Sequence, residues 1–401
     1  MPTPNGSSRT AALGCALALL LPLTLAATAS AYPSAPPDAT TSAARPERPA
    51  TGPRLPAPTG PHAVGSSTLH LVDRSRPDPW VPDADGRELM VTMYYPAAEP
   101  GGGRPAPYAT TAEVELMMKG FGMTGVEPAE VSGLRTNSRV DARPAKGRHP
   151  LVVLSPGFGA SRYTLTHIAE DLASRGYVVA SVDHAYESLG TAMPDGRMLT
   201  CVACVAVDEN GVDPGVLTAA RAADVSFLLD RLTRPHPGWR YSDVIDRRRV
   251  GMAGHSIGGA SAATAMVGDR RVRAGINMDG AFWDALPPQG LDGRPFMMLG
   301  TETDHLPGGP DKTWDTTWPG LGGWKRWLTV AGSEHFTFSD KPVYDDRFGL
   351  PHSPLPPERA VALTRDYVAA FFDRHLRGRP QPLLDGPSAS NPEVRFHRPQ
   401  S

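Results

Sequence analysis

Gly254-His255-Ser256-Ile257-Gly258 is the stretch that decides the fold of this chain. It has the pattern G-x-S-x-G, with a strand-like run before it at 249–253 and small residues of helical character after it at 259–266. A serine between a strand and a helix is held in a strained turn that exposes its hydroxyl, and the flanking glycines let neighbouring backbone approach closely. The stretch therefore predicts a nucleophile at Ser256. The alternative interpretation is a glycine-rich turn that only packs.

Strand-like and helix-like segments alternate on both sides of this turn. The strand candidates are 68–73, 87–95, 150–155, 177–182, 249–253, 272–278, 295–299 and 325–330, and the helix candidates are 165–173, 216–233, 259–266 and 358–376. We expect the first two strands to form an antiparallel pair. The run at 150–155 is apolar throughout, which is typical of a strand buried on both faces. The alternation predicts an α/β fold with a mostly parallel central sheet and helices on both faces.

A serine nucleophile needs a base and a carboxylate that orients the base. In a G-x-S-x-G hydrolase the base follows the serine in the chain, which leaves His305, His335, His352, His375 and His397. His335 lies in a turn directly after the last strand, where it can reach the carboxyl edge of the sheet, and it is the predicted base. Asp279 and Asp304 each follow a strand. Position alone leaves both as candidates for the acid.

The oxyanion of an acyl-transfer reaction needs two N–H donors. One is expected from the backbone of Ile257, directly after the nucleophile. The other is expected from the loop after the strand at 150–155, which reads Ser155-Pro156-Gly157-Phe158-Gly159. Phe158 is the predicted second donor.

Two segments lie outside the alternating pattern. Residues 101–148 are predicted to form either a lid over the site or an ordinary helix that covers the sheet edge. Residues 186–215 contain Cys201 and Cys204. In an exported protein this C-x-x-C spacing favours a small disulfide, with free thiols and a metal site as the alternatives.

The beginning of the chain has the features of a signal peptide. Arg9 precedes an apolar run at 11–27, and Ala29-Ser30-Ala31 is an A-x-A cleavage site. We therefore expect residues 1–31 to be removed and the protein to be secreted, with a membrane anchor as the alternative. Residues 32–64 are rich in Pro, Ala, Thr and Ser and are predicted to be disordered.

The catalytic domain is expected to span 65–378, followed by a tail at 379–401. A formal net charge of −2 gives no electrostatic reason to expect nucleic acid or an anionic membrane as a partner. No spacing typical of a metal site is present, and the expected chemistry requires no metal or organic cofactor. We expect no transmembrane segment in the mature chain.

The motifs together resemble the platelet-activating-factor acetylhydrolase family of α/β-hydrolases, in its plasma-type and secreted bacterial branch. The resemblance covers roughly 65–378 and is carried by 155–159, 182–184, 254–259, 278–283 and 332–336. It implies that the acid follows the strand soon after the nucleophile, which favours Asp279, 23 positions after Ser256 (279 − 256 = 23). Family members often open the oxyanion loop with His-Gly, where this chain has Pro156-Gly157. That difference bears on substrate preference.

These observations predict an exported serine ester hydrolase. The resemblance implies short acyl esters, such as the acetyl ester of an ether phospholipid, as substrates, which could be met at a lipid interface. Bacterial lipases, cutinases and polyester hydrolases share the glycine-rich motifs and tend to place the acid one strand later, so Asp304 and a broad lipase activity remain alternatives. More remote alternatives are an acyltransferase and a binding protein without catalytic activity.

Overall fold

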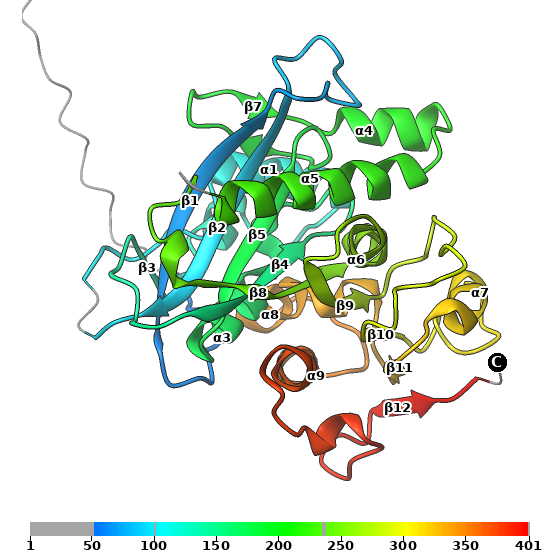
Figure 1. Ribbon diagram of the computed structural model, residues 1–401. Helices are drawn as coiled ribbons and strands as arrows, with labels where there is room; N and C mark the ends of the chain where they lie inside the picture. The colour runs from blue at the N-terminus through cyan, green and yellow to red at the C-terminus, as the bar shows by residue number, and fades with distance from the viewer. Residues whose placement is uncertain (1–51, 100–101, 235–237, 400–401) are drawn as a thin grey trace, which may run out of the picture. The chain divides into compact units, whose positions relative to one another are not determined.

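The computed structural model describes residues 52–99, 102–234 and 238–399. The predicted signal peptide at 1–31, and the part of the predicted disordered segment before residue 52, lie outside the described residues. The described chain consists of a large sheet with helices on both of its faces (Figure 1).

The strands and helices fall close to the expected segments, with several short additions. The strands are β1 (Ala63–Asp73), β2 (Arg87–Ala97), β3 (Ser138–Val140), β4 (His149–Ser155), β5 (Val178–His184), β6 (Thr191–Ala192), β7 (Met198–Leu199), β8 (Ile245–His255), β9 (Val272–Met278), β10 (Phe296–Thr301), β11 (Lys325–Val330) and β12 (Val394–His397). The α-helices are α1 (Thr111–Phe121), α2 (Pro128–Ser132), α3 (Thr166–Ser174), α4 (Val202–Cys204), α5 (Gly215–Thr233), α6 (Ile257–Gly268), α7 (Thr313–Thr317), α8 (Lys341–Phe348) and α9 (Pro357–Arg377).

Ten strands form the main sheet in the order β12-β11-β10-β9-β8-β4-β5-β2-β1-β3. The six strands from β11 to β5 in this order are all parallel to their neighbours. Strand β2 pairs antiparallel with both β5 and β1, as expected for the opening pair. The prediction of an α/β fold with a mostly parallel sheet is therefore confirmed.

Strand β4 shows why helices must cover both faces of this sheet. Its successive side chains alternate between two hydrophobic clusters because strand residues point to opposite faces in turn. Val152 and Leu154 pack with residues of α3 and α9, whereas Leu151 and Val153 pack with residues of α5 and α6. The apolar run at 150–155 thus supplies both cores, and the helices lie on the two faces accordingly (Figure 1).

The prediction of disorder for 32–64 is wrong for its described part. Leu55 is buried in a cluster that includes residues of α1 and α8. The backbone N–H and the hydroxyl of Thr59 both donate to one carboxylate oxygen of Asp171, at 2.8 and 2.7 Å. The segment has no hydrophobic periodicity of its own, so the neighbouring α3 supplies the interactions that order it.

Residues 379–399 are likewise more than a tail. Within them, β12 pairs antiparallel with β11 and forms one edge of the main sheet. Val394 is buried, and the ring nitrogen Nε2 of His397 lies 2.8 Å from the Thr329 hydroxyl. Strand β12 has only four residues, one of which is an arginine, so its sequence pattern is too short to predict a strand.

Within residues 102–148, β3 belongs to the main sheet, and the helices α1 and α2 pack against each other. Helix α1 begins with a capping box between Thr110 and Glu113. Its side chains Val114 and Met117 are buried in the cluster that also contains Tyr163. The lid and the edge-covering helix both stay predictions.

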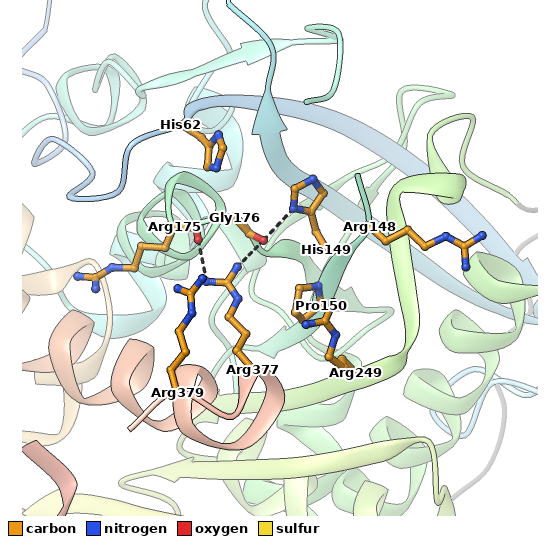
Figure 2. Close-up of a pocket in the computed structure, with 9 residues that line it drawn as sticks. All are labelled: His62, Arg148, His149, Pro150, Arg175, Gly176, Arg249, Arg377 and Arg379. Atoms are coloured by element: carbon orange, nitrogen blue, oxygen red, sulfur yellow. Dashed lines mark hydrogen bonds between the residues drawn. The ribbon is translucent and has the colours of Figure 1, made fainter. Parts of the chain in front are cut away.

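A basic hollow of about 320 Å³ lies at the amino-terminal edge of the parallel strands (Figure 2). Arginines and histidines make up most of its lining, and none of the nine lining residues is acidic. His149, the first residue of β4, lies there with its Nδ1 atom 3.0 Å from the carbonyl oxygen of Gly176. This edge is opposite the one where the strands end, so the hollow is separate from the predicted catalytic groups.

Candidate active site

Ser256 lies in a sharp turn between β8 and α6. Its backbone has φ 55° and ψ −128°, a left-handed conformation that is strained for a residue with a side chain. A Cβ atom at Gly258 would come within 2.1 Å of the carbonyl oxygen of Ser155, so only glycine fits at that position. The strained serine and the tight glycine are the features expected of a nucleophile turn.

The structure brings Ser256, His335 and Asp279 together at the carboxyl edge of the sheet. The Nε2 atom of His335 lies 3.1 Å from the hydroxyl oxygen of Ser256, and its Nδ1 atom lies 2.7 Å from Oδ2 of Asp279. A carboxylate only accepts hydrogen bonds, so Nδ1 carries the proton and Nε2 of the neutral ring accepts from the serine. This is the arrangement that a base needs to deprotonate the serine.

Asp304 occupies a different place, although it too follows a strand. Its carboxylate contacts the hydroxyls of Thr301 and Thr303, at 3.4 and 3.0 Å, and makes no hydrogen bond to a histidine among the described residues. Of the two candidates for the acid, Asp279 is therefore the one that faces the predicted base.

Asp279 is held as an anion. Burial alone would raise the pKa of this carboxyl group, but hydrogen bonds from His305 and His335 outweigh burial and hold the pKa well below its usual range. The backbone N–H of Thr301 also donates to Oδ1 of Asp279, at 2.6 Å. The carboxylate is thus ionised and fixed in orientation.

His255 supports the segment that carries the predicted base. Burial lowers the pKa of His255 to about 3, so its ring is neutral near pH 7. Its Nε2 atom lies 2.7 Å from the backbone carbonyl oxygen of His335, which accepts the hydrogen bond. The two imidazole rings also pack together, with centroids 4.7 Å apart.

The two predicted oxyanion donors remain available to a substrate. Among the hydrogen bonds between described residues, none uses the backbone N–H of Phe158 or of Ile257 as donor. The loop around Phe158 is fixed by its neighbour, because the N–H of Gly159 donates to Glu187 O at 3.0 Å and Gly159 O accepts from Leu189 N at 2.8 Å. The N–H of Phe158 is therefore presented on a fixed loop, and that of Ile257 lies at the first residue of α6.

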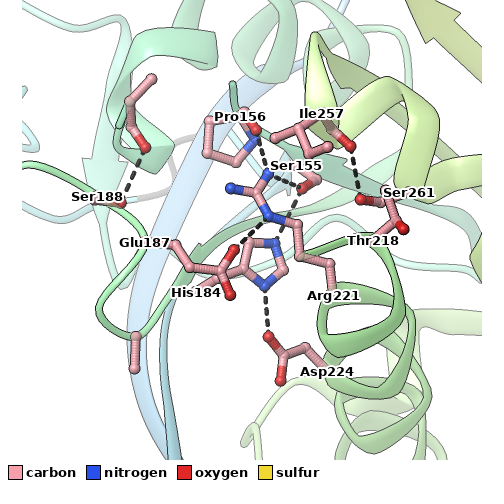
Figure 3. A network of polar contacts seen from close by, with 12 residues as sticks. Ser155, Pro156, His184, Glu187, Ser188, Thr218, Arg221, Asp224, Ile257 and Ser261 are labelled. Atoms are coloured by element: carbon pink, nitrogen blue, oxygen red, sulfur yellow. Dashed lines mark hydrogen bonds and ion pairs between the residues drawn. The ribbon is translucent and has the colours of Figure 1, made fainter. Parts of the chain in front are cut away.

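A buried ionic network lies directly behind this loop (Figure 3). The guanidinium of Arg221 donates to the carbonyl oxygen of Pro156 at 2.5 Å and to Oε2 of Glu187 at 2.7 Å. His184 bridges Oγ of Ser155, at 3.0 Å, and a carboxylate oxygen of Asp224, at 2.7 Å.

The group Ser155–His184–Asp224 has the residue types of a catalytic triad, but all three residues are buried. We conclude that it is structural. Neither this group nor Arg221 was predicted from the sequence. The only signal of the group was the stretch Val182-Asp183-His184, which the structure places at the end of β5.

The cysteine-containing segment forms part of the wall around the serine. Cys201 and Cys204 are joined by a disulfide bond. Cys201 packs in a small hydrophobic cluster with Leu217 of α5 and with the two residues whose N–H groups are the predicted oxyanion donors, Phe158 and Ile257.

On the other side, Phe121 of α1 packs edge-to-face on Phe336, which follows the predicted base. Apolar and aromatic side chains thus surround the reactive groups.

Within residues 52–99, 102–234 and 238–399, no group of three or more His, Cys, Asp or Glu side chains is arranged to hold a metal ion. No described helix is long and apolar enough to cross a membrane.

Comparisons with known proteins show similarity to acetylhydrolases and esterases. Residues 51–193 match the family model described as "Platelet-activating factor acetylhydrolase, isoform II". A "Probable 1-alkyl-2-acetylglycerophosphocholine esterase" of Arthroderma benhamiae is 28% identical over 85% of this chain and 93% of its own length. The platelet-activating factor acetylhydrolase of Gallus gallus is 24% identical over 81% of this chain and 84% of its own length. The solved structure of a ferulic acid esterase from Streptomyces cinnamoneus is 47% identical, with a TM-score of 0.78, and the match covers 86% of this chain and all of that chain.

The sheet, the nucleophile turn and the similarity to esterases define an α/β-hydrolase that acts as a carboxylic ester hydrolase. Within that superfamily, the chain belongs to the platelet-activating-factor acetylhydrolase family. The resemblance drawn from the sequence motifs is therefore confirmed, as is the prediction of an ester hydrolase.

Proposed function

We propose that this protein hydrolyses esters through a covalent acyl-enzyme on Ser256, with His335 as general base and Asp279 as the orienting acid. The observation that carries the proposal is the unbroken chain of hydrogen bonds from the serine hydroxyl through His335 to Asp279, with distances of 3.1 and 2.7 Å. None of these three side chains needs to move before the proton is transferred.

The reaction follows from the protonation states of these groups. His335 takes the proton of Ser256 as its oxygen attacks the ester carbonyl, and Asp279 stabilises the imidazolium that forms. The N–H groups of Phe158 and Ile257 bind the negative charge that develops on the carbonyl oxygen. His335 then donates its proton to the leaving alcohol, and a water molecule that it deprotonates releases the acid.

A fluorophosphonate probe tests the nucleophile. The probe should modify Ser256 stoichiometrically, and mass spectrometry of a digest should locate the adduct there. Ser256→Ala should abolish both labelling and ester hydrolysis while retaining the melting temperature. Labelling of folded wild-type protein at a different residue, or none at all, would contradict the proposal.

Short acyl esters are the proposed substrates. The support is the names of two relatives, a probable 1-alkyl-2-acetylglycerophosphocholine esterase and a platelet-activating factor acetylhydrolase, both of which refer to an acetyl group. Phe121 and Phe336 pack edge-to-face on one side of the site and Phe158 lies in the apolar cluster on the other, and these bulky side chains support a small acyl group rather than a long one.

A second candidate is an aromatic acyl ester. The 47% identical structure is a ferulic acid esterase, and its match covers the whole of that chain. An aromatic acyl group would find edge and face partners in the same phenylalanines.

One experiment separates the acyl specificities. Values of kcat/KM would be measured for acyl esters of one alcohol with two to twelve carbons, for methyl ferulate and for an acetylated ether phospholipid. A maximum at two to four carbons supports the short-acyl proposal. A preference for methyl ferulate supports the second candidate, and activity that rises with chain length would indicate a broad lipase instead.

Secretion and action at a lipid interface are also proposed. Secretion is supported by the apolar run and the Ala29-Ser30-Ala31 site. Action at an interface is supported by the exposed apolar side chains Val205, Val216 and Trp283. Expression of the full chain in a bacterial host tests the first proposal, since the exported protein should begin near residue 32. Co-sedimentation with phosphatidylcholine vesicles tests the second, and Trp283→Ser should weaken it without affecting hydrolysis of a soluble ester.

A further inference from the structure

A second histidine contacts the proposed catalytic acid. His305 lies in the loop after β10, and its Nδ1 atom is 2.6 Å from Oδ1 of Asp279, the oxygen that does not face His335. Its Nε2 atom is 3.0 Å from Oδ2 of Asp311. The side chain of His305 is only 5% exposed, so its two ring nitrogens are committed to these two carboxylates.

The geometry determines the protonation state of His305. A neutral imidazole carries one N–H donor and one acceptor nitrogen, whereas two ionised carboxylates only accept. Both nitrogens must therefore donate, and the ring is an imidazolium. Asp311 is ionised, because hydrogen bonds from His305 and Thr313 outweigh burial and lower its pKa. Burial would lower the pKa of His305, but the hydrogen bonds to Asp279 and Asp311 raise it to about 9.

The surroundings hold the imidazolium in place. The ring of His305 stacks on Trp314 with centroids 4.1 Å apart, and the indole N–H of Trp327 donates to the backbone carbonyl oxygen of His305 at 2.6 Å. These contacts orient the ring independently of Asp279.

We infer that His305 is a positioning residue that is charged near neutral pH, fixes the carboxylate of Asp279 toward His335 and sets the pH at which His335 becomes active. This inference rests on the proposed function, since His305 acts only through Asp279 on His335.

The charged groups around His335 make the expected effect specific. They are Asp279, which it contacts, and behind Asp279 the cation of His305 and the anion of Asp311, while the adjacent His255 is neutral. The neighbouring Glu334 is paired with Lys341 at 2.8 Å, and this pair adds no net charge. Together these groups carry one net negative charge. Removing the cation leaves two negative charges, and removing the outer anion leaves none. The two changes should therefore move the protonation of His335 in opposite directions.

The pH dependence of kcat/KM on a soluble acetyl ester tests this directly. His305→Asn retains an N–H donor near Oδ1 but removes the charge, and it should move the acid limb to higher pH by about one unit. Asp311→Asn should move it to lower pH by a similar amount. His149→Asn, at the opposite edge of the sheet, is the matched control and should leave the limb in place (Figure 2).

A purely structural role would lower stability or kcat without moving the acid limb. Active-site titration with a fluorophosphonate normalises each rate to the folded fraction. Opposite shifts in the two variants support the inference. Shifts in the same direction, or no shift in either, overturn it.

Nitrogen NMR of histidine-labelled enzyme gives a readout independent of catalysis. At pH 7.5 one imidazole should show two protonated ring nitrogens, and its signals should disappear in His305→Asn. A neutral His305 would overturn the inference even if the esterase proposal holds. If the fluorophosphonate fails to label Ser256 while His305 is doubly protonated, the proposed function fails instead.

Discussion

The ring of His255 donates to the backbone carbonyl of His335, with 2.7 Å between Nε2 and the oxygen. The residue before the proposed nucleophile thus holds the segment that carries the proposed base. The contact joins the turn after β8 to the turn after β11, which are separated by 80 positions in the sequence. The relative placement of serine and histidine therefore depends on a third side chain as well as on the sheet.

Replacing His255 should impair positioning of the base. We expect His255→Ala to lower kcat by about 10²-fold, the effect of displacing a catalytic group by roughly 1 Å, with KM nearly unchanged. His255→Gln keeps an N–H donor of similar reach and should recover part of the loss. Steady-state kinetics on a soluble ester would measure both variants. Equal loss in the two would show that the hydrogen bond is not the important feature.

Asp279→Asn should be the most damaging conservative change outside Ser256 and His335. The amide leaves the shape of the site but favours the wrong tautomer of His335, which in a triad lowers kcat on the order of 10⁴-fold. Asp304→Asn is the matched control, and its kcat should stay within about twofold because the hydrogen bonds of its carboxylate to described residues come from threonine hydroxyls. The reverse result would assign the acid to Asp304.

The predictions for Ser256, His335 and the two oxyanion positions rest on chain order, that is, on which strand each residue follows. The structure brings Ser256 and His335 together, whereas the two oxyanion donors stay predictions. Asp279 and Asp304 could not be separated on that basis, because both follow parallel strands that end at the same edge. Only the spacing known from the family favoured Asp279.

The supporting residues gave almost no sequence signal. The contact of His305 with Asp279 depends on how the loop after β10 folds back. The contact of Arg221 with the carbonyl oxygen of Pro156 depends on the rotation of α5 about its axis. Helical spacing predicts that one face of α5 is buried but does not predict which polar group an arginine on that face will meet. The order of residues 52–62 also comes from neighbours distant in the sequence, such as Asp171.

Arg221→Met should destabilise the protein and loosen the oxyanion loop. The change removes the donor to Pro156 and leaves Glu187 with fewer partners in a buried network. Breaking such a buried pair costs about 3–5 kcal/mol of unfolding free energy, which urea denaturation would measure. Arg231→Met, on the exposed part of the same helix, is the control and should change the unfolding free energy by less than about 0.5 kcal/mol.

In the folded fraction of Arg221→Met, kcat should fall by a larger factor than KM changes, since the oxyanion is bound most tightly in the transition state. Unchanged kcat would show that the loop is positioned without Arg221.

Asp340 should make stability fall as the pH rises. Burial raises the pKa of Asp340 to about 7, although its carboxylate accepts hydrogen bonds from the hydroxyl of Tyr108 at 2.7 Å and from the N–H of His167 at 3.1 Å. In the unfolded chain the pKa is about 3.9, so between these values the folded state binds more protons than the unfolded state. The contribution of Asp340 to the unfolding free energy is therefore fully present below about pH 4 and is lost as the pH rises toward 7, by up to about 4 kcal/mol.

Asp340→Asn removes this dependence, and its unfolding free energy should decline less than that of the wild type between pH 5 and pH 8. Urea denaturation at several pH values measures the difference, with the exposed Asp243→Asn as control. Parallel curves for wild type and Asp340→Asn would show that Asp340 is ionised throughout this range.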